Sequence, residues 1–169
     1  MKLSRTDLNL GLIDKTVFFN PNILPERNTH FMNDKIKCNI SSQKNTSKSY
    51  KIHGNLFLIV KYECVRCLDD NIIDHKLPFD LEILLFDKNI NNDFDTNDYL
   101  QLKEDETHID LSKFFADIIA LAKPIKPLCM PKCMGICIIC GQNKNRISCS
   151  CTMSHQTSVW DDLKKLNIK

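Results

Sequence analysis

Apolar and polar residues alternate along much of the first half of the chain, a pattern typical of half-buried β-strands. Leu8, Leu10 and Leu12 occupy every second position of their segment, and the clearest alternation of apolar and polar residues covers residues 51–64. Because proline cannot donate to a sheet ladder, Pro78 is expected either to split the last extended stretch into two strands or to mark a sheet edge with a bulge. We therefore expect extended segments over residues 7–19, 35–41, 51–64 and 72–87.

Residues 110–123 have helical periodicity instead. Asp110 is the expected N-cap, since its carboxylate can accept from the first free N–H groups, and Pro124 ends the helix. One amphipathic helix beside several alternating segments predicts an α+β fold, with an antiparallel β-rich sheet or partly open barrel and one packed helix. The apolar stripe of this helix consists of Leu111, Phe114, Phe115, Ile118, Leu121 and Ala122.

The chain divides into two expected parts. Residues 1–124 are predicted to form the β-rich core that includes the helix, and residues 125–169 a cysteine-rich, zinc-ribbon-like segment with a short C-terminal helix around Trp160. No motif of a catalytic site occurs, because the chain lacks a P-loop, a Gly-x-Ser-x-Gly elbow and a Gly-rich dinucleotide turn. A protein without enzymatic activity is therefore predicted.

Six of the nine cysteines lie between residues 129 and 151, a density that indicates either disulfides or metal. The first residues have no apolar core of a signal peptide, so we expect a cytoplasmic protein whose thiols stay reduced. The odd total also disfavours a closed set of disulfides. Zn²⁺ is the expected ion, because paired thiolates suit a tetrahedral site of four sulfurs.

The spacing suggests which thiols share an ion. Cys137-Ile-Ile-Cys140-Gly141 has the form of a zinc knuckle, a short turn that directs two sulfurs to one point. The glycine that follows can adopt a positive φ as the chain turns away. Cys149 and Cys151 are the candidates that complete this first site.

A further pair, Cys64 and Cys67, lies in the turn between two predicted strands. These thiols could join Cys129 and Cys133 in a second site of four sulfurs, which would leave Cys38 as a small buried core residue. A redox role is disfavoured, because reactive C-x-x-C pairs sit at the start of a helix and a turn follows here. One or two Zn²⁺ per chain are therefore expected.

Two other arrangements stay open. Cys133, Cys137 and Cys140 have the spacing that holds a [4Fe–4S] cluster in radical-SAM enzymes, although the chain is short for the barrel that those enzymes need. His155 could also replace one thiolate at a zinc site. A set of buried cysteines without any ligand is disfavoured by their density.

Charge is distributed unevenly along the chain. Residues 80–110 contain ten acidic residues and two lysines, a net charge of −8. Residues 111–169 contain nine lysines or arginines and three aspartates, a net charge of +6. A basic segment held by metal is a candidate nucleic-acid surface, whereas a general abundance of Lys, Asn and Ile would produce the same charge without selection for binding.

Several motifs occur together in the second part of the chain. They are C-x-R-C-L at residues 64–68 after a strand, IDL at 109–111 before the helix, ALAKPIKPLCMPKCMGICIICGQN followed by CSC, and the ending VWDDLKKL. Together they resemble the large ribosomal RNA subunit accumulation protein family, the YceD-like proteins, over residues 50–169. Two departures from the family pattern, Ile138 in place of a proline and SVWDD near the end, remove no cysteine.

The resemblance implies a ribosome-biogenesis factor that supports synthesis, processing or stability of 23S rRNA, bound to that RNA or to a large-subunit precursor particle, with zinc in a structural role. Lys and Arg would contact phosphates, and an aromatic ring would stack on unpaired bases. The alternative is a zinc-stapled protein–protein interaction module that docks a ribosome-assembly protein and acts on rRNA only indirectly. The candidate RNA contacts are Lys123, Lys126, Lys132, Lys144, Arg146 and Trp160.

Overall fold

The structure is a computed structural model that describes residues 1–86, 99–103 and 105–152. The elements in chain order are β1 (Lys2–Ser4), α1 (Arg5–Leu10), β2 (Leu12–Phe19), η1 (Pro21–Ile23), β3 (His30–Phe31), β4 (Ile36–Thr46), β5 (Ser49–Glu63), β6 (Asp70–Phe86), β7 (Tyr99–Lys103), β8 (His108–Asp110) and α2 (Ser112–Leu121). None of the helices in these ranges is long and apolar enough to cross a membrane. The expected helix around Trp160 falls outside the described residues, as do residues 87–98 and 104 of the acidic stretch.

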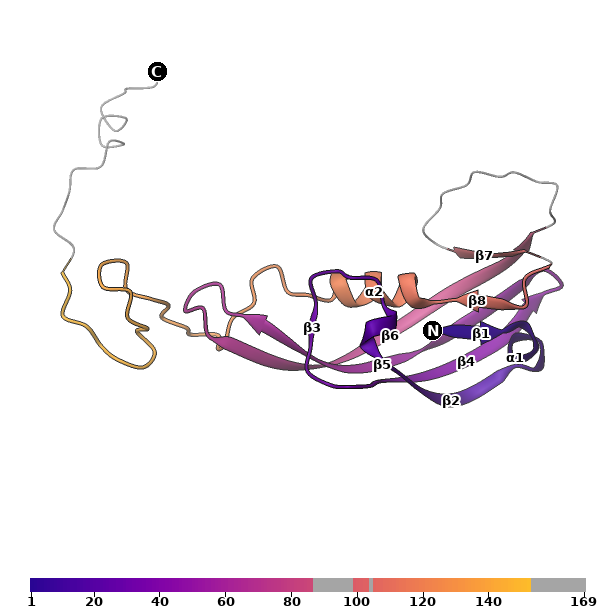
Figure 1. Cartoon of the computed structure of the whole chain (residues 1–169), viewed down its shortest axis with the longest axis horizontal. Coiled ribbons are helices and arrows are strands. Elements are labelled where there is room, and N and C mark those ends of the chain that lie inside the picture. The colour runs from indigo at the N-terminus through magenta and orange to yellow at the C-terminus, as the bar shows by residue number, and fades with distance from the viewer. Residues whose placement is uncertain (87–98, 104, 153–169) are drawn as a thin grey trace, which may run out of the picture.

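The main sheet has the strand order β2-β4-β5-β6-β7, with β3 paired to β5 beside it. Its pairs are antiparallel except that of β6 and β7, which is parallel. β5 and β6 form one long hairpin, paired continuously from Ser49↔Leu84 to Glu63↔Asp70. β1 and β8 form a separate antiparallel pair. The tip of the β5–β6 hairpin points away from β7 and toward the cysteine-rich segment (Figure 1).

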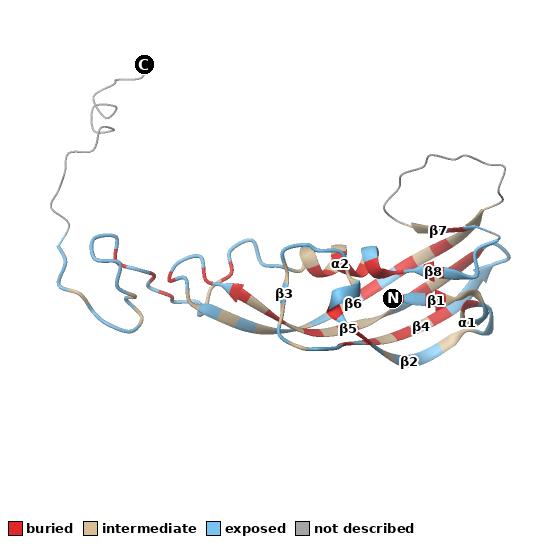
Figure 2. Cartoon of the chain, viewed as in Figure 1, coloured by how far each residue is buried: buried red, intermediate tan, exposed pale blue. Residues whose placement is uncertain are grey.

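Helix α2 covers one face of this sheet, and the hydrophobic core lies between them (Figure 2). Leu56, Leu58 and Val60 of β5 are buried on that face, while the residues between them are partly exposed on the other. Phe115 of α2 stacks on Phe19, with ring centroids 5.8 Å apart. The predicted α+β class, an antiparallel-rich sheet with one main helix and a cysteine cluster after it, is confirmed.

The expected extended segment at residues 7–19 is wrong in its first half, where the chain forms α1. Ser4 caps this helix: its Oγ accepts from the N–H of Asp7 at 3.1 Å and lies 2.8 Å from the Asp7 carboxylate. Such a reciprocal cap satisfies the free donors of the first turn. Gly11 ends the helix with φ 75°. The cap and the glycine therefore outweigh the alternation of leucines.

Pro78 does not interrupt β6, so the expected break or bulge there is wrong. The N–H of Leu85 donates to the carbonyl of Lys48, which places that N–H on the β5 side of the strand. Because N–H directions alternate along a strand, the nitrogen of Pro78 faces away from β5. β7 pairs with β6 only from Glu82 onward. Pro78 therefore occupies an edge, where no ladder donor is needed.

Helix α2 begins later than predicted, with Leu111 at the N-cap position and no side-chain capping bond from it. Asp110 acts one residue earlier, because its Oδ1 accepts from the N–H of Ser112 at 2.9 Å. The same oxygen lies 3.2 Å from the amino group of Met1. Burial opposes ionisation of Asp110, but Ser112 and the Met1 amino group lower its pKa to about 2.

Candidate metal centres

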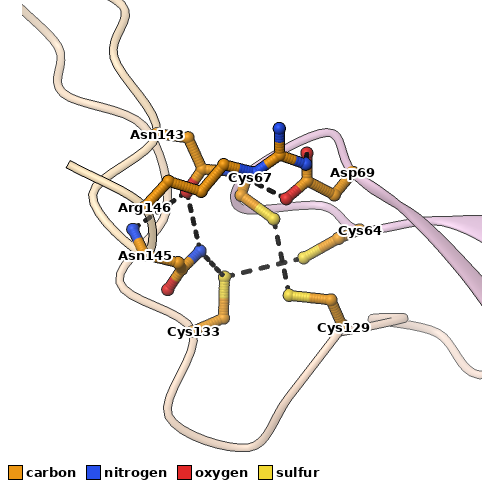
Figure 3. A network of polar contacts seen from close by, with 8 residues as sticks. All are labelled: Cys64, Cys67, Asp69, Cys129, Cys133, Asn143, Asn145 and Arg146. Atoms are coloured by element: carbon orange, nitrogen blue, oxygen red, sulfur yellow. Dashed lines mark hydrogen bonds and ion pairs between the residues drawn. The ribbon is translucent and has the colours of Figure 1, made fainter.

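Eight cysteines converge in two groups of four, and within each group all sulfurs lie within 4.8 Å of one another. The hairpin group contains Cys64, Cys67, Cys129 and Cys133; the distal group contains Cys137, Cys140, Cys149 and Cys151. The hairpin group joins the tip of the β5–β6 hairpin to a segment more than sixty residues away in sequence (Figure 3). The distal group is built within one continuous stretch.

The sulfur spacing of the hairpin group suits a tetrahedral ion. Cys64 Sγ and Cys133 Sγ are 3.8 Å apart, and Cys67 Sγ and Cys129 Sγ are 3.4 Å apart. Zinc–sulfur bonds of ~2.3 Å in a tetrahedron place sulfurs about 3.8 Å apart, whereas a disulfide needs ~2.05 Å. All nine cysteines are free thiols. The donor set and its geometry therefore fit Zn²⁺.

In each group, two of the four cysteines lie in a C-x-x-C turn, and the two turns have the same hydrogen bonds. In the first, the N–H of Cys64 donates to Asp69 O at 2.9 Å and the N–H of Leu68 donates to Cys64 O at 2.9 Å. In the second, the N–H of Cys137 donates to Gln142 O at 2.8 Å, and the N–H of Gly141 donates to Cys137 O at 2.8 Å. The flanking strand pairs match as well: Glu63↔Asp70 and Ile136↔Asn143. The two C-x-x-C turns therefore share one backbone geometry, and we call each of them a knuckle.

The fifth residue of each knuckle has a left-handed backbone. Gly141 has φ 72° and Leu68 has φ 62°. Glycine adopts this conformation freely, whereas a residue with a Cβ incurs a cost of ~1–2 kcal/mol there. The glycine identified the distal turn as a knuckle in the sequence. Cys64 and Cys67 were predicted as metal ligands in a hairpin turn, but Leu68 in place of glycine gave no sign that this turn has the same backbone.

Backbone N–H groups favour a thiolate at the first cysteine of each knuckle. Burial of the Cys64 thiol opposes ionisation, but the N–H groups of Cys129, Arg66 and Cys67 lower its pKa to about 6. The N–H groups of Cys140 and Ile139 lower the pKa of Cys137 to about 6 as well.

The remaining thiols respond to the negative charge that gathers around them. The N–H of Asp69 favours the Cys67 thiolate, but burial and the thiols of Cys129 and Cys64 raise its pKa to about 12. The thiol of Cys140, together with burial, raises the pKa of Cys151 to about 12. Four sulfurs this close ionise together only when a cation offsets their charge, so the arrangement suits metal coordination.

Arg66 connects the hairpin tip to the cysteine-rich segment. Its Nη1 donates to Cys133 O at 2.9 Å, and its carbonyl accepts from the N–H of Ile136 at 3.0 Å. Gly135 passes so close that a Cβ there would lie 2.9 Å from Arg66 O. The chain between the two groups therefore rests directly on the first knuckle.

Asp69, which follows the knuckle at Cys64, contacts two residues that lie in sequence between cysteines of the distal group (Figure 3). Its carboxylate accepts from Asn143 Nδ2 at 2.7 Å and pairs with Arg146 Nη2 at 3.0 Å. Asn145 then donates to Cys133 Sγ at 3.2 Å. These outer residues were not predicted; the only sequence signal was the position of Asp69, two residues after Cys67.

The two groups differ in exposure. Cys64 is fully buried, and Cys67 and Cys133 are nearly so, beside Leu128 in a small apolar cluster of their own. In the distal group only Cys137 is buried, while Cys140 and Cys151 are exposed. Solvent and chelators therefore reach the distal sulfurs more readily.

The other roles considered for these residues are a [4Fe–4S] cluster, a histidine ligand and a buried core cysteine. Cys133 belongs to the hairpin group while Cys137 and Cys140 belong to the distal group, so these three do not converge on one [4Fe–4S] cluster. His155 falls outside the described residues. Cys38 is completely buried in β4, and burial raises its pKa to about 12. It lies in the main core and in neither group of four.

The predicted RNA contacts lie along the same segment as the cysteines. Arg146 is exposed but engaged with Asp69, so it contributes to the fold of the segment. Trp160 falls outside the described residues. The remaining candidates are all exposed: Lys123, Lys126, Lys132 and Lys144.

A family model described as "Large ribosomal RNA subunit accumulation protein YceD" matches residues 52–167, which is more than half of the chain. A maize (Zea mays) protein named "Large ribosomal RNA subunit accumulation protein YCED homolog 1, chloroplastic" is 40% identical over 60 residues, covering 36% of this chain and 20% of its own. The Arabidopsis thaliana protein of the same name is 34% identical over 72 residues, covering 43% and 22%. The chain thus spans about a fifth of these curated relatives. No solved structure matches it significantly.

Proposed function

Because the chain belongs to the large ribosomal RNA subunit accumulation protein YceD family, we propose that it is a ribosome-biogenesis factor without enzymatic activity. It supports synthesis, processing or stability of 23S rRNA, in association with that RNA or a large-subunit precursor particle, in a cytoplasmic compartment that keeps thiols reduced. The observation that carries the proposal is the match over residues 52–167, which includes every cysteine of the two groups.

In this proposal each group of four cysteines holds one structural Zn²⁺. The ligands are Cys64, Cys67, Cys129 and Cys133 at one ion and Cys137, Cys140, Cys149 and Cys151 at the other. Four thiolates leave no open position for water or substrate, which is typical of structural zinc. The ions would hold residues 125–152 in place without taking part in a reaction.

Exposed lysines support RNA contact by the cysteine-rich segment. Lys123, Lys126, Lys132 and Lys144 are all exposed on one stretch of 22 residues. A zinc-held segment presents such charges in a fixed arrangement, at lower entropic cost than a free chain. Arg146 and Trp160 complete the proposed set, with Arg146 sharing its charge with Asp69.

Two measurements test the proposal. Elemental analysis of protein purified under reducing conditions is expected to give two zinc ions per chain, and folded protein with none would refute the metal part. Crosslinking in cells followed by sequencing is expected to recover large-subunit rRNA. Recovery of no rRNA above background, in a strain where the tagged protein complements a deletion, would refute the RNA part.

A second candidate function, docking of a ribosome-assembly protein, is favoured by exposed apolar side chains on the same segment. These are Met130, Met134, Ile136, Ile138, Ile139 and Ile147. Apolar side chains gathered on one surface segment are characteristic of protein interfaces. Salt separates the two candidates, because each contact to single-stranded phosphate adds about 0.7 to the slope of log affinity against log salt, whereas apolar contacts add none.

A further inference from the structure

Four residues form a row across the sheet on the face opposite α2. Phe18 of β2 is paired with Lys37 of β4, Lys37 with Phe57 of β5, and Phe57 with Lys76 of β6. We call this set the aromatic–lysine row. Directly opposed residues on neighbouring strands point to the same face, so two aromatic and two basic side chains alternate over four adjacent strands.

The row lies on the open face of the sheet. Cys38 and Leu56, which neighbour row members along their strands, are fully buried on the α2 side. Phe18 is 60% exposed, and Phe57 is half-buried. Helix α2 covers the other face (Figure 1). Strand spacing of ~4.8 Å places the two rings about 10 Å apart.

The two lysines of the row are held over an aromatic ring and not by carboxylates. Lys37 Nζ lies 5.3 Å and Lys76 Nζ 5.9 Å from the centroid of Phe57. Two other lysines of this face are paired with carboxylates: Lys51 with Asp80 at 3.0 Å, and Lys61 with Asp70 at 2.7 Å. Lys37 and Lys76 make no such ion pair within the described residues, so their charges stay available to a ligand.

We propose that the aromatic–lysine row binds unpaired RNA, with bases stacked on Phe18 and Phe57 and phosphates paired with Lys37 and Lys76. Every base has a face that can stack on a phenyl ring, and exposed aromatics on a sheet are an established platform for single-stranded nucleic acid. The next positions along the strands, Asn39 and Asn55, lie opposite each other in the register of β4 and β5. Asn39 Oδ1 accepts from Thr16 Oγ1 at 3.1 Å, so the Asn39 NH₂ group and the Asn55 amide are the polar groups offered beside the rings. Duplex RNA offers the row no base faces, because its bases are stacked inside the helix. The inference deepens the proposed function, since it adds an RNA surface outside the cysteine-rich segment.

The test uses the full-length, zinc-loaded chain and fluorescently labelled oligouridylate, with a duplex of equal length for comparison. The variant Lys37→Gln/Lys76→Gln is expected to lower the salt slope of oligouridylate binding by about 1.4, which corresponds to two lost phosphate contacts. Phe57→Leu is expected to weaken binding by about 5- to 100-fold, the effect of one lost stacking contact. Cation–π contacts at exposed positions contribute little to stability, so the variants are expected to remain folded by circular dichroism.

The matched control is Lys51→Gln/Lys61→Gln, which removes the same charge from the same face at two lysines that are already paired with carboxylates. It is expected to change the salt slope by much less than the row variant. Equal loss in both double variants, equal affinity for duplex, or no binding of oligouridylate by the unmodified chain would each overturn the proposal.

Crosslinking in cells separates this inference from the proposed function. If the row variants still crosslink to rRNA at the level of the unmodified chain, RNA binding by the row is refuted and the proposed function is unaffected. If the row binds oligouridylate but the protein gives no rRNA crosslinks in cells, the RNA-binding role of the row is supported and the proposed ribosome-biogenesis function is refuted. Row variants that lose a protein crosslink while oligouridylate binding persists would assign the row to a protein partner instead.

Discussion

The two knuckles have the same backbone turn but very different support. The knuckle at Cys64 ends a hairpin with fifteen consecutive strand pairs, anchored in the main core. The knuckle at Cys137 is flanked by one isolated bridge, Ile136↔Asn143, and by no further strand pairing within residues 111–152. The same local motif can therefore either extend an existing sheet or stand almost alone, and in the second case we expect its order to depend on what its sulfurs bind.

Because their structural support differs, we expect the two cysteine groups to have different structural roles. The hairpin group brings residues 129–133 to the end of the β5–β6 hairpin, so with a metal bound we expect it to set where the cysteine-rich segment lies. We expect the distal group to organise only its own loop. Structural zinc sites of this size contribute ~10–16 kcal/mol of apparent binding free energy, most of it as folding energy. We expect that energy to be confined to the segment, because the sheet and α2 share a separate core.

The largest expected effect separates the two groups directly. Cys64→Ser is expected to remove one zinc and to abolish hydrogen-exchange protection in both the knuckle and residues 128–136, because the segment loses its anchor. Cys137→Ser is expected to remove one zinc and to affect only residues 137–151. Protection of β5 below the knuckle is expected to survive in both variants. Loss of the whole sheet in either variant would show that the metal also holds the main core.

Metal release is expected to occur in two phases. The distal sulfurs Cys140 and Cys151 are exposed, whereas Cys64 is fully buried, so a chelating dye is expected to remove the distal zinc first. The measurement is the time course of dye absorbance after mixing with excess chelator. Cys137→Ser is expected to lack the fast phase. A single phase, or a fast phase retained in that variant, would contradict the difference in access.

The link through Asp69 is expected to have a smaller effect. Asp69→Ala removes a hydrogen bond from Asn143 and the ion pair with Arg146, which together are expected to contribute about 1–2 kcal/mol to order in residues 134–146. Hydrogen exchange in that stretch measures the change. Asp70→Ala is the control, because it breaks an ion pair with Lys61 between the strands next to this turn and changes no residue of either cysteine group. Equal effects of both variants would mean that Asp69 does not connect the groups.

The smallest expected effects come from the fifth residue of each knuckle. Leu68→Gly is expected to stabilise the hairpin tip by about 0.5–1 kcal/mol, because relief of left-handed strain exceeds the entropy that glycine loses on folding. Gly141→Ala is expected to destabilise the distal loop by about 1 kcal/mol. A Cβ at Gly141 would meet nothing within 4 Å, so this effect reports the backbone alone. Chelator competition on each variant measures both changes, and a destabilised Leu68→Gly would show that the leucine side chain contributes packing that outweighs its strain.

Local patterns in the sequence determined the strands, the helix and the knuckle that ends in glycine. Side-chain alternation and helical spacing report which face of an element is buried, and C-x-x-C-G reports a turn whose geometry depends only on neighbouring residues. The same locality explains where these predictions were wrong: the cap at Ser4 overrode the alternation of leucines, and Pro78 needed neither a break nor a bulge at the edge position that it occupies. The number of cysteines and their C-x-x-C pairs also suggested two groups of four.

Only the tertiary structure decided the backbone of the knuckle at Cys64 and what surrounds it. Leu68 carries no glycine signal, and it adopts a left-handed backbone because the hairpin and the contacts of Arg66 hold the turn closed. Asp69 meets Asn143 and Arg146 across more than seventy residues of chain, a proximity that no local pattern encodes. The aromatic–lysine row likewise exists only in the register of four strands. Contacts between segments distant in sequence depend on which strands pair and in which register, and that choice is made by the packing of the whole core.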